Sequence, residues 1–162
     1  MPLNAEELDR LAEMPRRLRT FAAELAGQER FRPSPEPHAF SVVEHACHLR
    51  DLEEEGYTVR IRRMLREVNP ELADFDGTAV AAERGYLAQD LGSALRDFEF
   101  ARRSNVERLR ILPDEALDRR ARLAGAGSIT LRRLVQLMVE HDAGHLAELR
   151  DLLAAAGRGR VA

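Results

Sequence analysis

The chain has 162 residues, of which 44% are hydrophobic and 33% are charged, a composition typical of a single globular domain. Its net charge of −3 argues against a nucleic-acid partner, and no apolar stretch is long enough to cross a membrane. The start of the chain lacks the pattern of a signal peptide, and Cys47 is the only cysteine, so we expect a cytoplasmic protein without an internal disulfide.

Helical spacing dominates the chain, and no segment alternates for long enough to indicate a strand. A first helix is predicted from about Asn4 to Gln28, in which Asn4 is the candidate N-cap and Pro15 is expected to kink or divide the helix. Residues 31–40 contain three prolines, which are incompatible with a helix, so we predict an extended loop there.

A capping box predicts a sharp start for the second helix. Ser41 and Glu44 are spaced so that the side chain of each can satisfy a backbone donor of the other. This helix should continue to about Val68. A loop containing Pro, Asp and Gly should follow over residues 69–78.

Two further helices complete the expected bundle. The connection 113–129 should hold one short helical turn and a glycine loop, and the last helix should start at Thr130, run to about Ala156 and leave a frayed tail at 157–162. Four long amphipathic helices predict an all-α, up-down four-helix bundle with a single domain over residues 1–162. The third of these helices is centred on six apolar residues, Leu87, Leu91, Leu95, Phe98, Val106 and Leu109.

Two histidines lie one helical turn apart in the last helix. His141 and His145 are spaced i, i+4, so they point in the same direction, on the face that Leu134, Met138 and Leu149 mark as buried. Two buried imidazoles need hydrogen-bond partners or an ion. A metal ion would need at least one more ligand, which in a bundle comes from a facing helix.

The second helix offers two candidates for that third ligand, His45 and His48. Periodicity slightly favours His45, which falls on the apolar stripe between Val42 and Leu49, whereas His48 lies at the edge of the stripe beside Leu52. The spacing by itself leaves both candidates open.

Two segments carry a family resemblance. The stretch FSVVEHACHLRDLE, at 40–53, resembles the second-helix motif of the DinB-like superfamily, the damage-inducible four-helix metal-binding proteins. The stretch HDAGH, at 141–145, resembles the C-terminal HDxxH motif of that superfamily. The resemblance extends from about residue 5 to residue 155. It implies that His48, His141 and His145 bind one divalent metal ion, with His45 beside them, although the reverse roles of His45 and His48 stay open.

Three residues depart from the superfamily pattern. Phe40 stands where tryptophan is common, Gly144 where a histidine is often found, and Glu148 where glutamine is frequent. The implied ligand set survives these changes. Because the three positions should lie beside the ion or one turn from it, we expect the changes to bear on the substrate.

The implied site has an open coordination position. Three neutral imidazoles without a fourth protein ligand are typical of catalytic rather than structural metal sites. Zinc is the first expectation, with nickel, iron, copper or manganese as alternatives. Four nearby carboxylates are candidates for orienting the imidazole rings, namely Glu44, Asp51, Asp142 and Glu148.

The resemblance implies a metal-dependent enzyme. Members of the superfamily include transferases that use a low-molecular-weight thiol such as mycothiol or bacillithiol, so a thiol S-transferase acting on a small-molecule substrate in detoxification or stress response is expected. The alternatives are a metal-dependent hydrolase, a non-catalytic metal-binding stress protein and an interaction module whose histidines are only core. The resemblance also implies a homodimer. Arginines near the site could recognise an anionic substrate, but the sequence does not distinguish one among 25.

Overall fold

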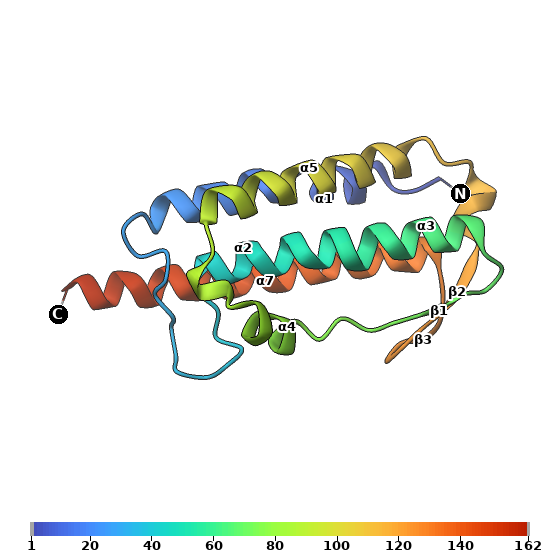
Figure 1. The fold of residues 1–162 in the computed structure, drawn as a ribbon. Helices are drawn as coiled ribbons and strands as arrows, with labels where there is room; N and C mark the ends of the chain where they lie inside the picture. The colour runs from blue at the N-terminus through green and yellow to red at the C-terminus, as the bar shows by residue number, and fades with distance from the viewer. Residues whose placement is uncertain (1, 162) are drawn as a thin grey trace.

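Four long helical segments form the bundle in the computed structural model, which describes residues 2–161 (Figure 1). The prediction of an all-α four-helix bundle is confirmed. The segments are α1 (Ala5–Glu24), the continuous run of α2 (Val42–Asp51), π-helix η1 (Leu52–Tyr57) and α3 (Thr58–Arg66), then α5 (Leu91–Arg110) and α7 (Leu131–Val161).

The second and third segments run in the same direction, which departs from the alternating, up-down order expected from the sequence. In Figure 1, α1 and α7 run one way and both α2–α3 and α5 run the other, so α2 and α5 pack against each other as parallel neighbours. The connection 67–90 makes this possible because it returns along the length of the bundle. It contains α4 (Gly77–Arg84) and the 3-10 helix η2 (Tyr86–Ala88).

The third helix is shorter than the apolar pattern predicts. Leu87 belongs to η2, and α5 begins only at Leu91 after an N-cap at Asp90. Gly85 separates α4 from η2 because it adopts a φ of 59°, a left-handed conformation that commonly ends a helix.

The start of α1 agrees with the sequence, but Pro15 does not divide the helix. The Asn4 side chain accepts a hydrogen bond from the N–H of Glu6 at 3.0 Å, and α1 continues through Pro15 to Glu24. The expectation of a divided helix is therefore wrong. Pro15 is buried in the bundle, where packing of the surrounding helix offsets the loss of one backbone hydrogen bond.

The capping box at the start of α2 is confirmed. The N–H of Glu44 donates to Oγ of Ser41 at 3.3 Å, and the N–H of Ser41 donates to Oε1 of Glu44 at 3.1 Å. The helix that follows ends at Arg66, close to its expected end.

The π-helix η1 changes the register of the second segment. The N–H and the hydroxyl of Thr58 both donate to the carbonyl oxygen of Glu53, five residues earlier. A π-turn takes up one residue more than an α-turn, so every later side chain is rotated by about 100° relative to a continuous α-helix. As a result Arg60 is buried where the α-helical period would place Val59, which is only partly buried.

The expectation that no strand is present is wrong for the connection 113–129. After the short helix α6 (Asp114–Leu117), β2 (Arg120–Leu123) and β3 (Gly127–Thr130) form an antiparallel hairpin, and β1 (Glu71–Leu72) pairs parallel to β2. Inward and outward residues alternate over only four positions of β2, too few to stand out in the sequence.

The last helix starts where predicted and continues past its predicted end. Oγ1 of Thr130 accepts a hydrogen bond from the N–H of Arg133 at 3.1 Å, and α7 then runs to Val161. The expected frayed tail at 157–162 is helical as far as Val161, and residue 162 lies outside the described residues. Within the described part, no helix combines the length and the apolar character needed to cross a lipid bilayer.

A buried polar layer lies between two apolar clusters. On α7, Leu146 and Leu149 belong to one cluster, whereas Leu134 and Met138 belong to the other. The histidine motif at 141–145 separates them. The bundle thus encloses several buried polar side chains in this layer: His45, His48, Glu53, Arg102, Asn105, Asp142 and His145.

Candidate metal centre

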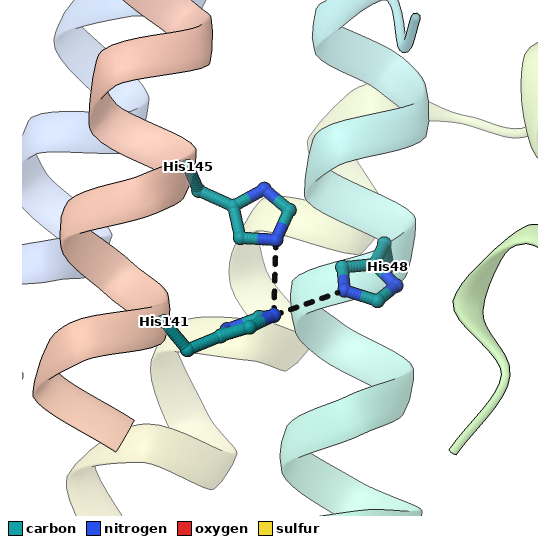
Figure 2. Close-up of side chains that lie close together, drawn as sticks. All are labelled: His48, His141 and His145. Carbon is teal, nitrogen blue, oxygen red and sulfur yellow. Dashed lines mark hydrogen bonds between the residues drawn. The ribbon is translucent and has the colours of Figure 1, made fainter. Parts of the chain in front are cut away.

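Three histidines from two helices converge in the polar layer. His141 and His145 of α7 face His48 of α2 (Figure 2). Nε2 of His141 lies 3.1 Å from Nε2 of His145 and 3.4 Å from Nε2 of His48. One ring nitrogen from each residue lies within 4.8 Å of the other two. The structure therefore brings together the three residues that the DinB-like motifs single out.

These three residues fit a divalent metal ion. A tetrahedral ion with metal–nitrogen bonds of about 2.0–2.1 Å separates its ligand atoms by about 3.3 Å, and the two Nε2–Nε2 distances of 3.1 and 3.4 Å lie on either side of that separation. Imidazole nitrogens suit zinc, nickel, iron and copper. The donor set and its spacing are consistent with a metal site.

The three imidazoles are in the neutral form that binds metal. Burial lowers the pKa of His48 to about 4, assisted by repulsion from His141. Burial lowers the pKa of His141 to about 4 as well, assisted by the positive charges of Arg102 and Arg60. The pKa of His145 is lowered further by burial and by the other histidines. A neutral ring offers a nitrogen lone pair without first losing a proton.

His45 lies on the other side of the His145 ring. Nδ1 of His45 is 2.8 Å from Nδ1 of His145, so one of the two rings donates to the other. For Nε2 of His145 to offer a lone pair to the cluster, its Nδ1 must carry the proton and donate to His45. Nε2 of His45 then carries a proton and faces the Glu148 carboxylate at 3.8 Å. His45 thus contacts a candidate ligand without contacting His141.

A second group of residues, which includes His45, also has the spacing of metal ligands. His45, His145 and Glu148 also place one ligand atom each within 4.8 Å of one another. This group shares His145 with the three-histidine cluster. It contains Glu148, whose side chain is 58% exposed, so its carboxylate is in contact with solvent, unlike the buried imidazoles.

Of the four carboxylates considered from the sequence, only Glu148 approaches the histidine rings, at 3.8 Å from His45 and 3.9 Å from His145. Glu44 belongs to the capping box and to an ion pair with Arg32. The other two are engaged elsewhere: Asp51 accepts from Arg50, Arg84 and Tyr86, and Asp142 accepts from Arg102.

The departures from the superfamily pattern have different surroundings. The ring of Phe40 lies 5.8 Å from the ring of His48 and packs against it. Gly144 faces open space, with no atom within 4 Å of a Cβ placed on it, so the absence of a histidine side chain at this position leaves the cluster untouched.

Cys47 is buried outside the cluster, and burial raises the pKa of its thiol to about 11, which keeps the thiol protonated.

Gly77, which the sequence analysis did not single out, packs directly on His48. A Cβ atom on Gly77 would lie 2.4 Å from Cε1 and 2.6 Å from Nδ1 of the His48 ring. Phe75, on the same connection, lies 5.9 Å from that ring. The start of α4 therefore holds His48 in place by close packing.

We expect Gly77→Ala to weaken zinc binding because the methyl group must displace the His48 ring. A reduction of about 10- to 100-fold is expected, comparable to the loss of a group that orients a metal ligand. Competition against a chelating indicator measures the affinity. Gly144→Ala is the matched control and should bind zinc as the wild type does. Equal affinity in the Gly77→Ala variant would contradict the role of this contact.

The buried histidines should also make the metal-free protein less stable in mild acid. Burial lowers the pKa of His45 to about 3 and that of His48 and His141 to about 4, whereas an unfolded histidine titrates near its ordinary value of 6.5. The unfolded chain therefore binds more protons than the folded chain between these values. Stability is fully present above pH 6.5 and falls as the pH decreases toward 4, by about 1.4 kcal/mol per pH unit for each histidine.

Urea unfolding of the chelator-treated protein between pH 7.5 and 5.5 measures this dependence. His45→Gln should flatten the slope, whereas His38→Gln should not, because His38 lies in an exposed loop. A free energy of unfolding that stays constant over this range would contradict the burial of neutral histidines.

A four-helix bundle with a buried cluster of histidines between two of its helices is the class of protein that the fold and the site define. The chain belongs to the DinB superfamily, whose family model matches residues 10–149. The expectation raised by the two sequence motifs is confirmed.

The fold is similar to that of YfiT from Bacillus subtilis, a solved structure described as a probable metal-dependent hydrolase with an unusual four-helix bundle topology. The two chains are 21% identical, the match covers 94% of this chain and 86% of YfiT, and the TM-score is 0.83. At this identity the likeness establishes the fold. No curated protein matches the chain significantly.

Proposed function

We propose that this protein is a divalent-metal-dependent enzyme in which His48, His141 and His145 hold the ion. The observation that carries the proposal is the convergence of three neutral Nε2 atoms at 3.1 and 3.4 Å in a buried layer. Membership of the DinB superfamily supports it, because its two motifs supply these three residues. Zinc is the first candidate, with nickel, iron, copper or manganese as alternatives.

A bound divalent ion with an open position lowers the pKa of a coordinated water or thiol and so supplies a nucleophile near neutral pH. The residues of this chain position that chemistry. When Nδ1–H of His145 donates its hydrogen bond to Nδ1 of His45, Nε2 of His145 is left unprotonated, and the packing of Gly77 and Phe75 holds His48. Arg102 engages Asp142 and keeps that carboxylate away from the histidine rings.

Two reactions follow from the two nucleophiles. Hydrolysis, with water as the nucleophile, is favoured by the similarity to YfiT and its description as a metal-dependent hydrolase. Transfer to a low-molecular-weight thiol is favoured by the resemblance to thiol-dependent members of the superfamily. Cytoplasmic location and a homodimer remain predictions.

Metal analysis tests the proposal first. Protein purified without chelator and without a nickel column should contain about one divalent ion per chain, and the ion should be lost from the triple alanine variant of His48, His141 and His145. His38→Ala is the control and should keep the ion. A wild-type protein that neither retains nor takes up a stoichiometric ion would rule out the metal centre.

Turnover is tested second, with ester and amide substrates for hydrolysis and with thiols plus an electrophile for S-transfer. Activity should appear with the ion and disappear on chelation. Stoichiometric metal without turnover of any of these compounds would favour the alternative, a non-catalytic metal-binding stress protein.

A further inference from the structure

A cleft of about 540 Å³ opens beside His141. Its walls come from η1 and α3, from α7 and from the turn between β2 and β3. This volume lies within the range of about 300–1,000 Å³ that is typical of small-molecule sites. Because His141 forms part of the wall, a molecule in the cleft lies next to the histidine cluster. Four polar side chains share the wall with it: Tyr57, Arg60, Asp74 and Glu140.

Arg60 is a buried cation without a carboxylate partner. Arg60 is only 8% exposed. Among the described residues, no carboxylate lies within 4.0 Å of its guanidinium. The hydrogen bond that it makes within the described part of the chain runs from Nη2 to the carbonyl oxygen of Ala73 at 3.0 Å. Arg102, by contrast, is 1% exposed and contacts two carboxylates, Asp142 at 2.6 Å and Glu53 at 3.0 Å. Buried charges are normally paired, so Arg60 lacks a counter-ion.

Tyr57 lies beside Arg60 and offers a second donor. The guanidinium carbon of Arg60 is 5.6 Å from the centre of the Tyr57 ring, which holds the side chain in place. Tyr57 is 5% exposed, and its hydroxyl makes no hydrogen bond to the described residues. Burial raises the pKa of Tyr57, so the hydroxyl stays protonated and able to donate.

The two acidic residues of the cleft accept hydrogen bonds from groups other than Arg60. Glu140 accepts from Arg133 at 2.7 Å, and Asp74 accepts from the N–H of Phe75 at 2.8 Å. Asp74 attracts Arg60 electrostatically from beyond ion-pair distance, while burial lowers the pKa of Arg60. Because Asp74 is exposed to solvent, the buried polar groups of the cleft without a charged partner are one cation, Arg60, and one neutral donor, Tyr57.

The π-helix places Arg60 on this face. Arg60 lies twelve positions after His48. In a continuous α-helix, the two side chains would therefore point about 120° apart around the helix axis. The additional residue in η1 reduces the effective separation to eleven positions, which is about three full turns. Arg60 therefore projects from the same side of the helix as His48.

We infer that Arg60 and Tyr57 bind an anionic oxygen group, a carboxylate or a phosphate, of the small molecule that occupies this cleft. That this molecule is a substrate rests on the proposed function, whereas binding of the anion does not require the metal ion. A planar guanidinium and a hydroxyl are suited to such oxygens. The anion would be held beside His141, so the remainder of the molecule reaches the histidine cluster.

Titrations with benzoate and phenyl phosphate test this inference in both chelator-treated and zinc-loaded protein, with amide chemical shifts as the readout. The wild type should bind at least one of the two anions saturably in both states. Arg60→Met should weaken binding at least about tenfold, Arg60→Lys less, and Tyr57→Phe a few-fold. Benzamide, which lacks the charge, should bind more weakly than benzoate. Arg122→Met, on the exposed side of β2, is the matched control and should bind as the wild type does.

Two further measurements separate this role from a structural one and from the proposed function. Arg60→Met should leave zinc affinity within about twofold and should not lower the resistance to urea. No carboxylate is left unpaired, and water can replace the donor to the carbonyl oxygen of Ala73, which is an exposed residue. Anion binding that is unchanged in Arg60→Met, or absent from the wild type in both states, would overturn the inference. Anion binding through Arg60 in a protein that takes up no zinc would uphold the inference and refute the metal centre.

Discussion

Replacing His48 with alanine is expected to lower the affinity for zinc about 100-fold or more. Structural zinc sites bind with about 10–16 kcal/mol shared among four ligands, so one imidazole accounts for roughly 2.5–4 kcal/mol. His48 contributes the only nitrogen from α2 that lies near His141, at 3.4 Å. Competition with a chelating indicator at pH 7.5 measures the loss.

His45→Ala is the matched comparison on the same helix. Among the three clustered histidines, His45 contacts His145, with 2.8 Å between the two Nδ1 atoms, and it acts on the cluster through the orientation and tautomer of that ring. We therefore expect a smaller loss, of about 10- to 100-fold. The opposite ranking, with His45→Ala losing zinc and His48→Ala retaining it, would assign the ion to His45, His145 and Glu148 instead.

Arg102→Met is expected to cause the largest loss of stability, about 3–5 kcal/mol. The Arg102 side chain is 1% exposed and donates to both oxygens of Asp142, at 2.6 and 3.1 Å, and it pairs with Glu53 at 3.0 Å. Without the guanidinium, two carboxylates remain buried and unpaired. Such a loss is a large fraction of the total stability of about 5–15 kcal/mol of a typical domain. Urea unfolding of the metal-free protein at pH 7.5 measures it.

Arg133→Met provides the control for an exposed ion pair. Arg133 contacts Glu140 at 2.7 Å, but both side chains are exposed, so its loss should cost at most about 1 kcal/mol. Adding Glu53→Gln and Asp142→Asn to Arg102→Met should restore part of the stability, because the two unpaired charges disappear with the cation. A cost for Arg102→Met as small as that for Arg133→Met would mean that the buried carboxylates are compensated in another way.

Much of the helical architecture can be predicted from local sequence. Asn4, Ser41 and Thr130 cap their helices because a side chain reaches backbone donors only a few residues away. The pairing of His141 with His145 follows from helical geometry for the same reason. The break at Gly85 was missed, since apolar residues continue across it with helical spacing.

The candidate site could be predicted only in part. Periodicity favoured His45 over His48, but both side chains are buried. His45 contacts Nδ1 of His145, whereas His48 contacts Nε2 of His141. The rotation of α2 relative to α7 decides which histidine faces the cluster. That rotation depends on packing between residues about 100 positions apart, which helical spacing does not encode.

By itself the sequence determined the helical class, the starts of α1, α2 and α7, the superfamily and the two neighbouring histidines of the last helix. The tertiary structure alone decided that α2 and α5 run parallel, that the β2–β3 hairpin lies at one end of the bundle, and that Gly77 packs on His48. It also decided that a π-turn brings Arg60 into a cleft beside His141. The first group of features arises from interactions within one or two helical turns. The second depends on contacts between distant segments, which can impose a local register that no regular period predicts.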